Sequence, residues 1–214
     1  RGDIVQREGD AWYRIEHYDR MAPFFIAEVS GHDHWMYVSS TGGLTCGRGN
    51  PDNALFPYET DDRIHDAHAT AGPATFLLVE RAGEVRLWQP FSRDPAIYGV
   101  ERKLYKNLTG NRLEFEEVNH DLGLSFTYQW STGERFGFIR TATLRERAGA
   151  AAQIEPVAAL LSEGQRIEVD EGLVVGDLLL ALVDLGLANS RAQPRDLCAR
   201  CALREVFQVE ERAV

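Results

Sequence analysis

Apolar and polar side chains alternate along several short stretches in the first two thirds of the chain. Residues 112–118 and 124–130 alternate in this way, with the period of a half-buried β-strand. Residues 24–29 and 35–38 are short runs rich in β-branched and aromatic residues, and Ser30-Gly31 separates them. The pattern predicts a succession of β-strands.

The spacing of these runs predicts hairpins. Residues 75–80 and 85–88 flank the four residues 81–84, a separation typical of a hairpin loop. Residues 131–134 form a predicted turn before a further strand at 136–144. Because the strands are regular and few helical patterns lie between them, we expect a mainly β fold in which antiparallel sheets pack as a sandwich.

The composition changes near residue 147 and divides the chain into two segments. Every aromatic residue except Phe207 lies before that point, and the last segment is rich in Ala and Leu and lacks His and Trp. We therefore expect a β-sandwich domain over residues 1–146 and a tail over 147–214. Three interpretations of the tail stay open: a separate helical element, a continuation that completes the sandwich, or a non-native end.

The tail itself predicts both strands and helices. Residues 152–161 and 166–169 are candidate strands. Residues 173–187 are apolar nearly all round, which favours a buried helix. Pro194 precedes a second helical candidate at 195–211. We therefore expect the tail to be partly helical.

The net charge of the chain bears on which partners it can bind, and its cysteine content bears on the compartment in which it occurs. Lys and Arg number 23 and Asp and Glu number 33, so the net charge is −10. An acidic chain suits neither a nucleic-acid backbone nor an anionic membrane, and we expect neither partner. Three cysteines do not form a disulfide framework, and the first residues carry no apolar leader. We therefore expect a reduced, cytoplasmic chain.

The segment 42–68 has the densest set of candidate binding residues. It is rich in Gly, Pro, Asn and Asp, which predicts a long, ordered loop rather than a strand or helix. Long loops on a rigid scaffold often carry function. Each polar residue here can either bind a hydroxyl-rich ligand or cap a turn of its own backbone. The polar candidates are Arg48, Asn50, Asp52 and Asn53, and the aromatic ones are Trp35, Phe56 and Tyr58.

The histidines suggest a metal site as an alternative. His32 and His34 are two residues apart, which places them on the same face of a strand, and His65 and His68 follow. Imidazoles with nearby carboxylates suit Zn²⁺, Mn²⁺ or Fe²⁺. The spacing resembles the metal motif of cupins, but residues 35–41 lack the carboxylate that this motif contains. The other interpretation is that these histidines only form hydrogen bonds.

No catalytic residue can be assigned from motifs. The sequence contains neither a Gly-x-Ser-x-Gly nucleophile motif nor a phosphate-binding loop. The neighbouring carboxylates Asp61-Asp62 and Glu116-Glu117 would face opposite sides of a strand, so neither pair forms an acid/base pair by itself.

Several longer motifs are similar to those of one family. They are the runs 34–48, 50–58, 60–62 and 116–124, with Tyr128-Gln129-Trp130 and Phe136-Gly137-Phe138. Over roughly residues 10–146 the chain resembles the N-terminal region of cellobiose-phosphorylase-like proteins, which are glycoside phosphorylases and hydrolases. The tail departs from this pattern, because further aromatic-containing strands would follow in the family.

The resemblance implies a β-supersandwich of the galactose-mutarotase-like kind. In this family the domain precedes a helical linker and an (α/α)6 barrel that carries the general acid and the phosphate site. The sandwich contributes dimer contacts and the rim of the sugar site. The resemblance thus implies an oligosaccharide or disaccharide ligand, a homodimer, a downstream barrel and no cofactor, with inorganic phosphate as co-substrate only of a full-length phosphorylase. The rim would hold Arg48, Asn50, Asp52, Asn53, Tyr58, Asp61 and Asp62.

Three functions therefore stay open. The chain could be an accessory domain that shapes the substrate site of a carbohydrate-active enzyme without its catalytic barrel. It could be a stand-alone sugar-binding module in which Trp35 or Tyr58 covers a pyranose face, although a strand Trp more often packs in the core. It could also be a metal-dependent, cupin-like enzyme that uses His32, His34, His65 and His68.

Overall fold

The computed structural model describes most of the first 147 residues and three short segments after them. The described ranges are 2–7, 9–56, 58–69, 73–81, 84–93, 97–133, 137–147, 153–155, 165–169 and 181–184. They form a mainly β structure with three sheets and three short 3-10 helices. No helix among them is long and apolar enough to cross a membrane.

The largest sheet has seven strands. Their order is β1 (Gly2–Arg7), β2 (Asp10–Glu16), β9 (Val100–Asn107), β10 (Arg112–Asn119), β11 (Leu124–Gly133), β12 (Gly137–Glu146) and β14 (Gln165–Val169). All neighbours in this sheet are antiparallel except β12 and β14, which are parallel.

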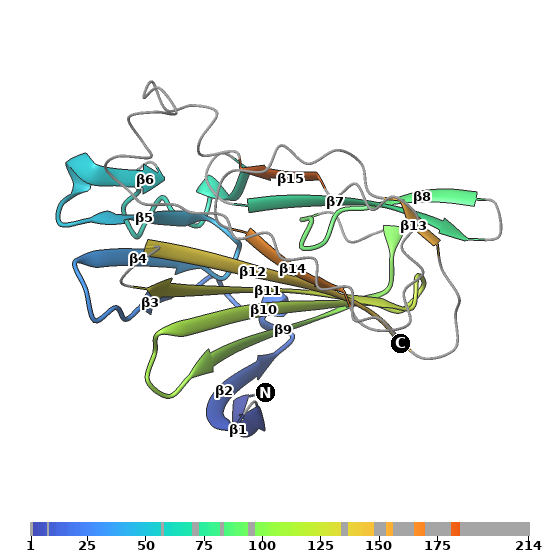
Figure 1. The fold of residues 1–214 in the computed structure, drawn as a ribbon, viewed down its shortest axis with the longest axis horizontal. Coiled ribbons are helices and arrows are strands. Elements are labelled where there is room, and N and C mark those ends of the chain that lie inside the picture. The colour runs from blue at the N-terminus through green and yellow to red at the C-terminus, as the bar shows by residue number, and fades with distance from the viewer. Residues whose placement is uncertain are drawn as a thin grey trace.

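Two four-stranded sheets lie along one side of the large sheet, β5 and β6 at one end and β7 and β8 at the other (Figure 1). The first contains β3 (Phe25–Glu28), β4 (His34–Ser39), β5 (Leu44–Arg48) and β6 (Ala54–Phe56). In the second, β7 (Pro73–Arg81) pairs with β8 (Glu84–Trp88), β13 (Gln153–Glu155) and β15 (Ala181–Asp184). The 3-10 helices are η1 (Tyr18–Arg20), η2 (Pro51–Asn53) and η3 (Ala67–Ala69).

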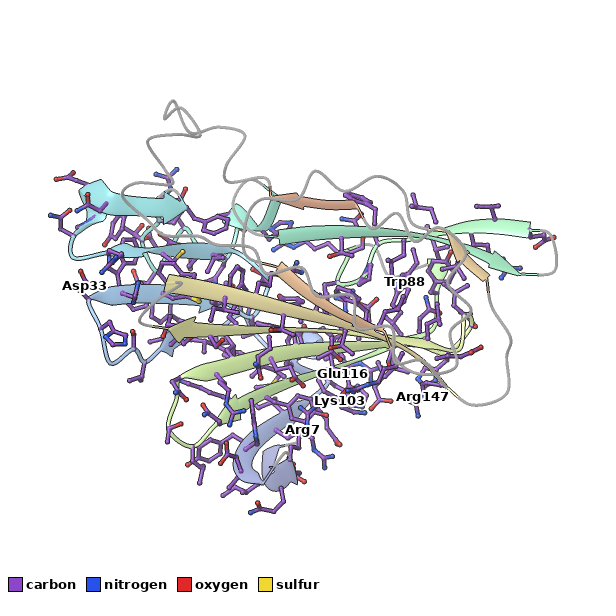
Figure 2. All side chains as sticks on the ribbon, in the orientation of Figure 1. Arg7, Asp33, Trp88, Lys103, Glu116 and Arg147 are labelled. Carbon is purple, nitrogen blue, oxygen red and sulfur yellow. The ribbon has the colours of Figure 1, made fainter. Side chains whose placement is uncertain are left out.

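A single hydrophobic core joins the three sheets. Figure 2 shows Trp88 directed from β8 into the space between the layers. Each large side chain that is fully buried contributes roughly 1.5–3 kcal/mol. The core includes Met36, Val38 and Phe56 from the first small sheet, Leu77 and Trp88 from the second, and Phe115, Phe126 and Trp130 from the large sheet. The expected sandwich-like, mainly antiparallel class is therefore confirmed.

Most of the strands predicted before residue 147 are present, but the predicted loop at 42–68 is wrong in part. Residues 44–48 and 54–56 of that segment form β5 and β6. β5 pairs with β4 and with β6, and the glycine that suggested a loop, Gly47, lies in β5 where there is no room for a side chain. A Cβ atom there would be 2.6 Å from the carbonyl oxygen of Asn53 and 2.8 Å from Cα of Ala54. Glycine in this strand permits close approach rather than a turn.

The described strands of the tail pair with strands of the first segment. β14 adds to β12, and β13 and β15 both pair with β7. The helix predicted at 173–187 is thus wrong for Ala181–Asp184, which form β15. Short apolar runs suit a strand and a buried helix equally, and pairing with β7 satisfies the backbone of this one. The rest of that prediction and the helix at 195–211 lie outside the described residues.

Candidate functional site

The outer face of the β3–β6 sheet carries a set of aromatic side chains. Side chains alternate along a strand, so Met36 and Val38 of β4 point into the core while Trp35 and Tyr37 point outward. Phe25 of β3 lies on the same outer face and is 42% exposed. Trp35 is therefore half-buried on the outer side of the sheet and does not pack in the core.

Four of these rings follow one another across the sheet. Phe25 stacks on Tyr37 with ring centroids 5.0 Å apart, and Tyr37 stacks on Trp35 at 6.1 Å. Tyr58 meets Trp35 edge-on at 5.9 Å and is 53% exposed. We call Phe25, Tyr37, Trp35 and Tyr58 the aromatic row. Phe25 and Tyr58, at the two ends of the row, are exposed, and Tyr37 and Trp35 between them are half-buried.

Gly47 supports the centre of the aromatic row. It is paired with Trp35 in the antiparallel register of β4 and β5. A Cβ atom at Gly47 would lie only 2.5 Å from Cζ2 of Trp35, so the indole packs closely over the bare backbone. The indole Nε1 is buried and has no hydrogen-bond partner among the described residues. The sheet thereby fixes the orientation of the largest ring.

Polar groups lie beside the aromatic row at the turn between β5 and β6. The contact of Gly47 with Asn53 and Ala54 places η2 next to Trp35. The side chain of Asn50 caps η2, since its Oδ1 accepts from the backbone N–H of Asp52 at 3.1 Å and from Nδ2 of Asn53 at 3.2 Å. Asn50 is therefore a turn-capping residue here, while Asp52 and Asn53 are exposed beside the row.

Arg48 and Asp33 form an ion pair at the end of β4 and β5. Two guanidinium nitrogens of Arg48, Nε and one terminal nitrogen, donate to Oδ1 of Asp33 at 3.1 and 2.8 Å. Figure 2 shows Asp33 at the outer end of the sheet. This hydrogen bonding holds the pKa of Asp33 below its usual range. The guanidinium of Arg48 is thus held in place at the polar edge.

Asp61 and Asp62 lie in the turn region that follows Tyr58, and both are exposed. A hydrogen bond with the side chain of Thr60 lowers the pKa of Asp62, which keeps this carboxylate charged at neutral pH. Both carboxylates come from the same connection as Tyr58, but no described contact places either of them against the aromatic row. They are weaker candidates for the site than Asp52 and Asn53.

The four histidines of the metal alternative do not converge. His34 begins β4 and lies edge-on to His32 at 6.1 Å, whereas His65 Nδ1 bonds to Ser39 Oγ at 2.7 Å. Ser39 is the last residue of β4 and His34 is the first. His65 therefore lies at the opposite end of this strand from His32 and His34, roughly 17 Å away along the strand. Within the described part of the chain, no group of three or more His, Cys, Asp or Glu side chains is placed to hold a metal ion.

Burial explains the state of two of these histidines. His34 is buried against Phe138, with ring centroids 5.1 Å apart, and neither ring nitrogen has a partner among the described residues. Burial lowers the pKa of His34, and burial together with the charge of Arg93 lowers the pKa of His68. Both imidazoles are therefore favoured in their neutral form.

Sequence reasoning missed two members of the aromatic row. Phe25 and Tyr37 belong to strands that were predicted, but their rings were not assigned to a site. The signal was present in the alternation, because residues 35 and 37 share a face whenever 36 and 38 form part of the core. In comparisons with models of protein families and with curated protein sequences, the chain matches neither.

Proposed function

We propose that the chain is a carbohydrate-binding β-sandwich that holds a disaccharide or oligosaccharide on the aromatic row. The observation that carries the proposal is the stacking of Phe25, Tyr37 and Trp35 at 5.0 and 6.1 Å, extended by Tyr58. Aromatic side chains that gather on an outer face and remain at least partly exposed are typical of an interaction surface. Successive rings offer several stacking positions, which favours a chain of sugars over a single one.

The chemistry of a pyranose matches both parts of this surface. Its axial C–H groups form apolar patches that an aromatic ring can cover, while its hydroxyls need donors and acceptors at the edge. Asp52 and Asn53 supply acceptors and donors beside Trp35, and Arg48 supplies a fixed guanidinium. A net charge of −10 also favours a neutral ligand over an anionic polymer.

The proposal extends to the parent protein through the resemblance to cellobiose-phosphorylase-like proteins. In this form the chain is a galactose-mutarotase-like supersandwich that serves as an accessory domain of a glycoside phosphorylase or hydrolase. A downstream (α/α)6 barrel carries out the chemistry, a homodimer is formed, and inorganic phosphate is a co-substrate of the full-length protein alone. The mainly β, sandwich-like class supports this form. The aromatic row serves equally in a stand-alone sugar-binding module.

Calorimetric titration of the chain with cellobiose and cellotetraose tests the proposal. We expect saturable binding that weakens roughly tenfold in Tyr58→Ala and in Trp35→Ala, because one stacked ring is worth about 1 kcal/mol or more. Tyr13→Ala is the matched control, since Tyr13 is 52% exposed and Tyr58 is 53% exposed. Absence of binding by the unaltered chain, or equal losses in Tyr13→Ala and Tyr58→Ala, would overturn the proposal.

A further inference from the structure

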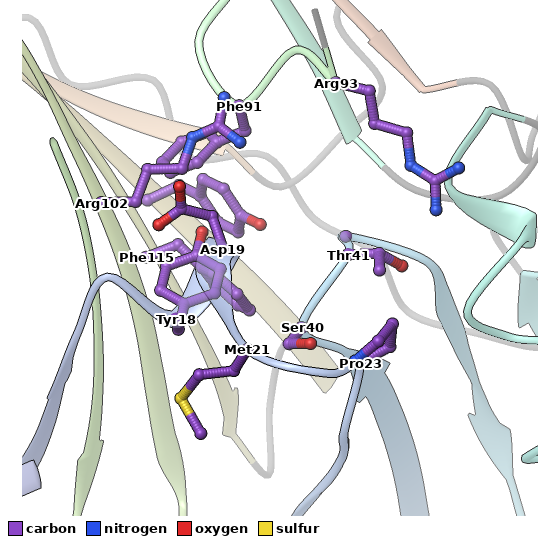
Figure 3. A pocket seen from close by; sticks show the side chains of 12 residues that line it. Tyr18, Asp19, Met21, Pro23, Ser40, Thr41, Phe91, Arg93, Arg102 and Phe115 are labelled. Atoms are coloured by element: carbon purple, nitrogen blue, oxygen red, sulfur yellow. The ribbon is translucent and has the colours of Figure 1, made fainter. Parts of the chain in front are cut away.

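We propose a second ligand site, for a single neutral sugar, in a cavity of about 240 Å³ between η1, the turn that joins β4 and β5, and the large sheet. Figure 3 shows Asp19 and Arg102 on one side of this cavity and Thr41 and Arg93 on the other. This site lies apart from the aromatic row and does not depend on it. Its residues come from segments that are distant in the sequence.

The backbone of Phe91 is the first sign that the cavity is a built feature. Phe91 has a φ of 62°, in the left-handed region that bulky side chains rarely adopt. Its N–H donates to Oε2 of Glu117 at 2.8 Å. Its ring packs against Tyr128 at 5.1 Å and Phe115 at 6.3 Å. Strain of this kind persists only where the surroundings enforce it, and it is concentrated at functional sites.

Glu117 holds the apolar wall of the cavity in place. This carboxylate is 1% exposed and also accepts from Nε1 of Trp88 at 2.9 Å and from Nε of Arg102 at 2.7 Å. A terminal nitrogen of Arg102 donates to the carbonyl oxygen of Ser92 at 2.6 Å. The negative charge of Glu117 thus compensates the positive charge of Arg102 within the wall. Glu117 holds the backbone N–H of Phe91, and Arg102 holds the carbonyl oxygen of the next residue, Ser92.

The polar groups of the cavity carry opposite charges. Arg93 is exposed, and one terminal nitrogen donates to the carbonyl oxygen of His65 at 3.2 Å. It forms no ion pair with a described carboxylate, so its charge is available to a ligand. Across the cavity, Asp19 is exposed and offers a carboxylate. Ser40 Oγ accepts from the N–H of Phe24 at 3.1 Å, which leaves its own proton for a further acceptor.

This combination suits a neutral polyhydroxyl ligand better than an anion. A phosphate or carboxylate attracted by Arg93 would be repelled by Asp19, whereas sugar hydroxyls can accept from one and donate to the other. The half-buried ring of Phe91, backed by the buried rings of Phe115 and Tyr128, provides a surface for the C–H groups of a pyranose. A volume of about 240 Å³ is below the roughly 300–1,000 Å³ of drug-sized sites, which limits the ligand to one sugar unit.

Calorimetric titration of the chain with D-glucose, D-galactose and inorganic phosphate tests the inference. We expect one hexose to bind with a stoichiometry of one, and Asp19→Asn and Arg93→Met to weaken its binding roughly tenfold to a hundredfold. The matched control is Arg20→Met, a neighbouring exposed residue of η1 that does not line the cavity. Asp19→Asn keeps the shape of the side chain, and near-ultraviolet circular dichroism verifies that each variant is folded.

Three outcomes would overturn the inference. In the first, the unaltered chain binds neither hexose. In the second, it binds phosphate at this site more tightly than either hexose although Asp19 is present. In the third, Tyr58→Ala weakens hexose binding as much as Arg93→Met does. If the first outcome is found, the proposed function of the aromatic row still holds provided that cellotetraose binds and that Trp35→Ala weakens cellotetraose binding. The two sites are therefore tested separately.

Discussion

The buried carboxylate of Glu28 lies near Lys106 without forming a hydrogen bond to it. The ammonium of Lys106 donates instead to the carbonyl oxygen of Ala27 at 2.6 Å. Glu28 is 6% exposed, and neither carboxylate oxygen has a hydrogen-bond partner among the described residues. Burial raises the pKa of Glu28 to about 8, and the charge of Lys106 opposes this only in part.

The protonation of Glu28 predicts a loss of stability with rising pH. In the unfolded chain Glu28 titrates near its ordinary value of 4.5, whereas the folded chain keeps the proton up to about 8. Between these values the folded state binds one more proton, so Glu28 contributes a fall in unfolding free energy of about 1.4 kcal/mol per pH unit. Urea unfolding across this range measures the slope.

The matched variants isolate this effect from other titrating groups. Glu28→Gln removes the titration and should flatten the pH dependence, while Glu84→Gln, on an exposed position of β8, should leave it unchanged. Parallel curves for the unaltered chain and Glu28→Gln would show that Glu28 is charged in the folded state.

Gly47→Ala should destabilise the chain by about 1–3 kcal/mol, since the added methyl group is forced against packed atoms. Its Cβ would meet Trp35, the carbonyl oxygen of Asn53 and Ala54 within 2.8 Å. Gly31→Ala is the control, because nothing lies within 4 Å of a Cβ at Gly31. Urea unfolding compares the two, and equal midpoints would contradict the close packing of Trp35 on β5.

Glu117→Gln should destabilise the chain by roughly 3 kcal/mol, because it leaves the largely buried guanidinium of Arg102 without its charge partner. Glu116→Gln serves as the control, since Glu116 is half-buried and accepts from the hydroxyl of Tyr105 at 2.8 Å. Thermal and urea unfolding give both values. A loss in Glu117→Gln no larger than in Glu116→Gln would show that Glu117 does not hold the wall of the cavity.

Local alternation predicted most strands of the first segment, because burial on one face leaves a period of two in the sequence. The prediction was wrong where the amino-acid composition of a strand is typical of another structure. Gly47 and the Asn and Asp residues around it are typical of a loop, yet the glycine serves contact between strands. Likewise, the apolar residues Ala181–Asp184 pair with β7 although a helix fits their pattern.

The candidate sites were predictable only in part. Trp35 and Tyr58 were singled out from the sequence, and the structure brings their rings to 5.9 Å. The cavity was not foreseen, because its lining comes from six separate segments and depends on the left-handed backbone of Phe91. The pattern of residues along the sequence does not predict that a bulky residue such as Phe91 has a positive φ. It also does not predict that Asp19 and Arg93 face each other across a cavity.

The indole N–H resonances of the four tryptophans provide the most direct test of the aromatic row. Trp12, Trp88 and Trp130 are each at most 5% exposed, so Trp35 alone is placed to meet a ligand on the outer face. On addition of cellotetraose to ¹⁵N-labelled chain, we predict a saturable shift of the Trp35 signal, assigned through its loss in Trp35→Phe, with the other three unchanged. Binding that leaves the Trp35 signal in place would contradict the proposed function.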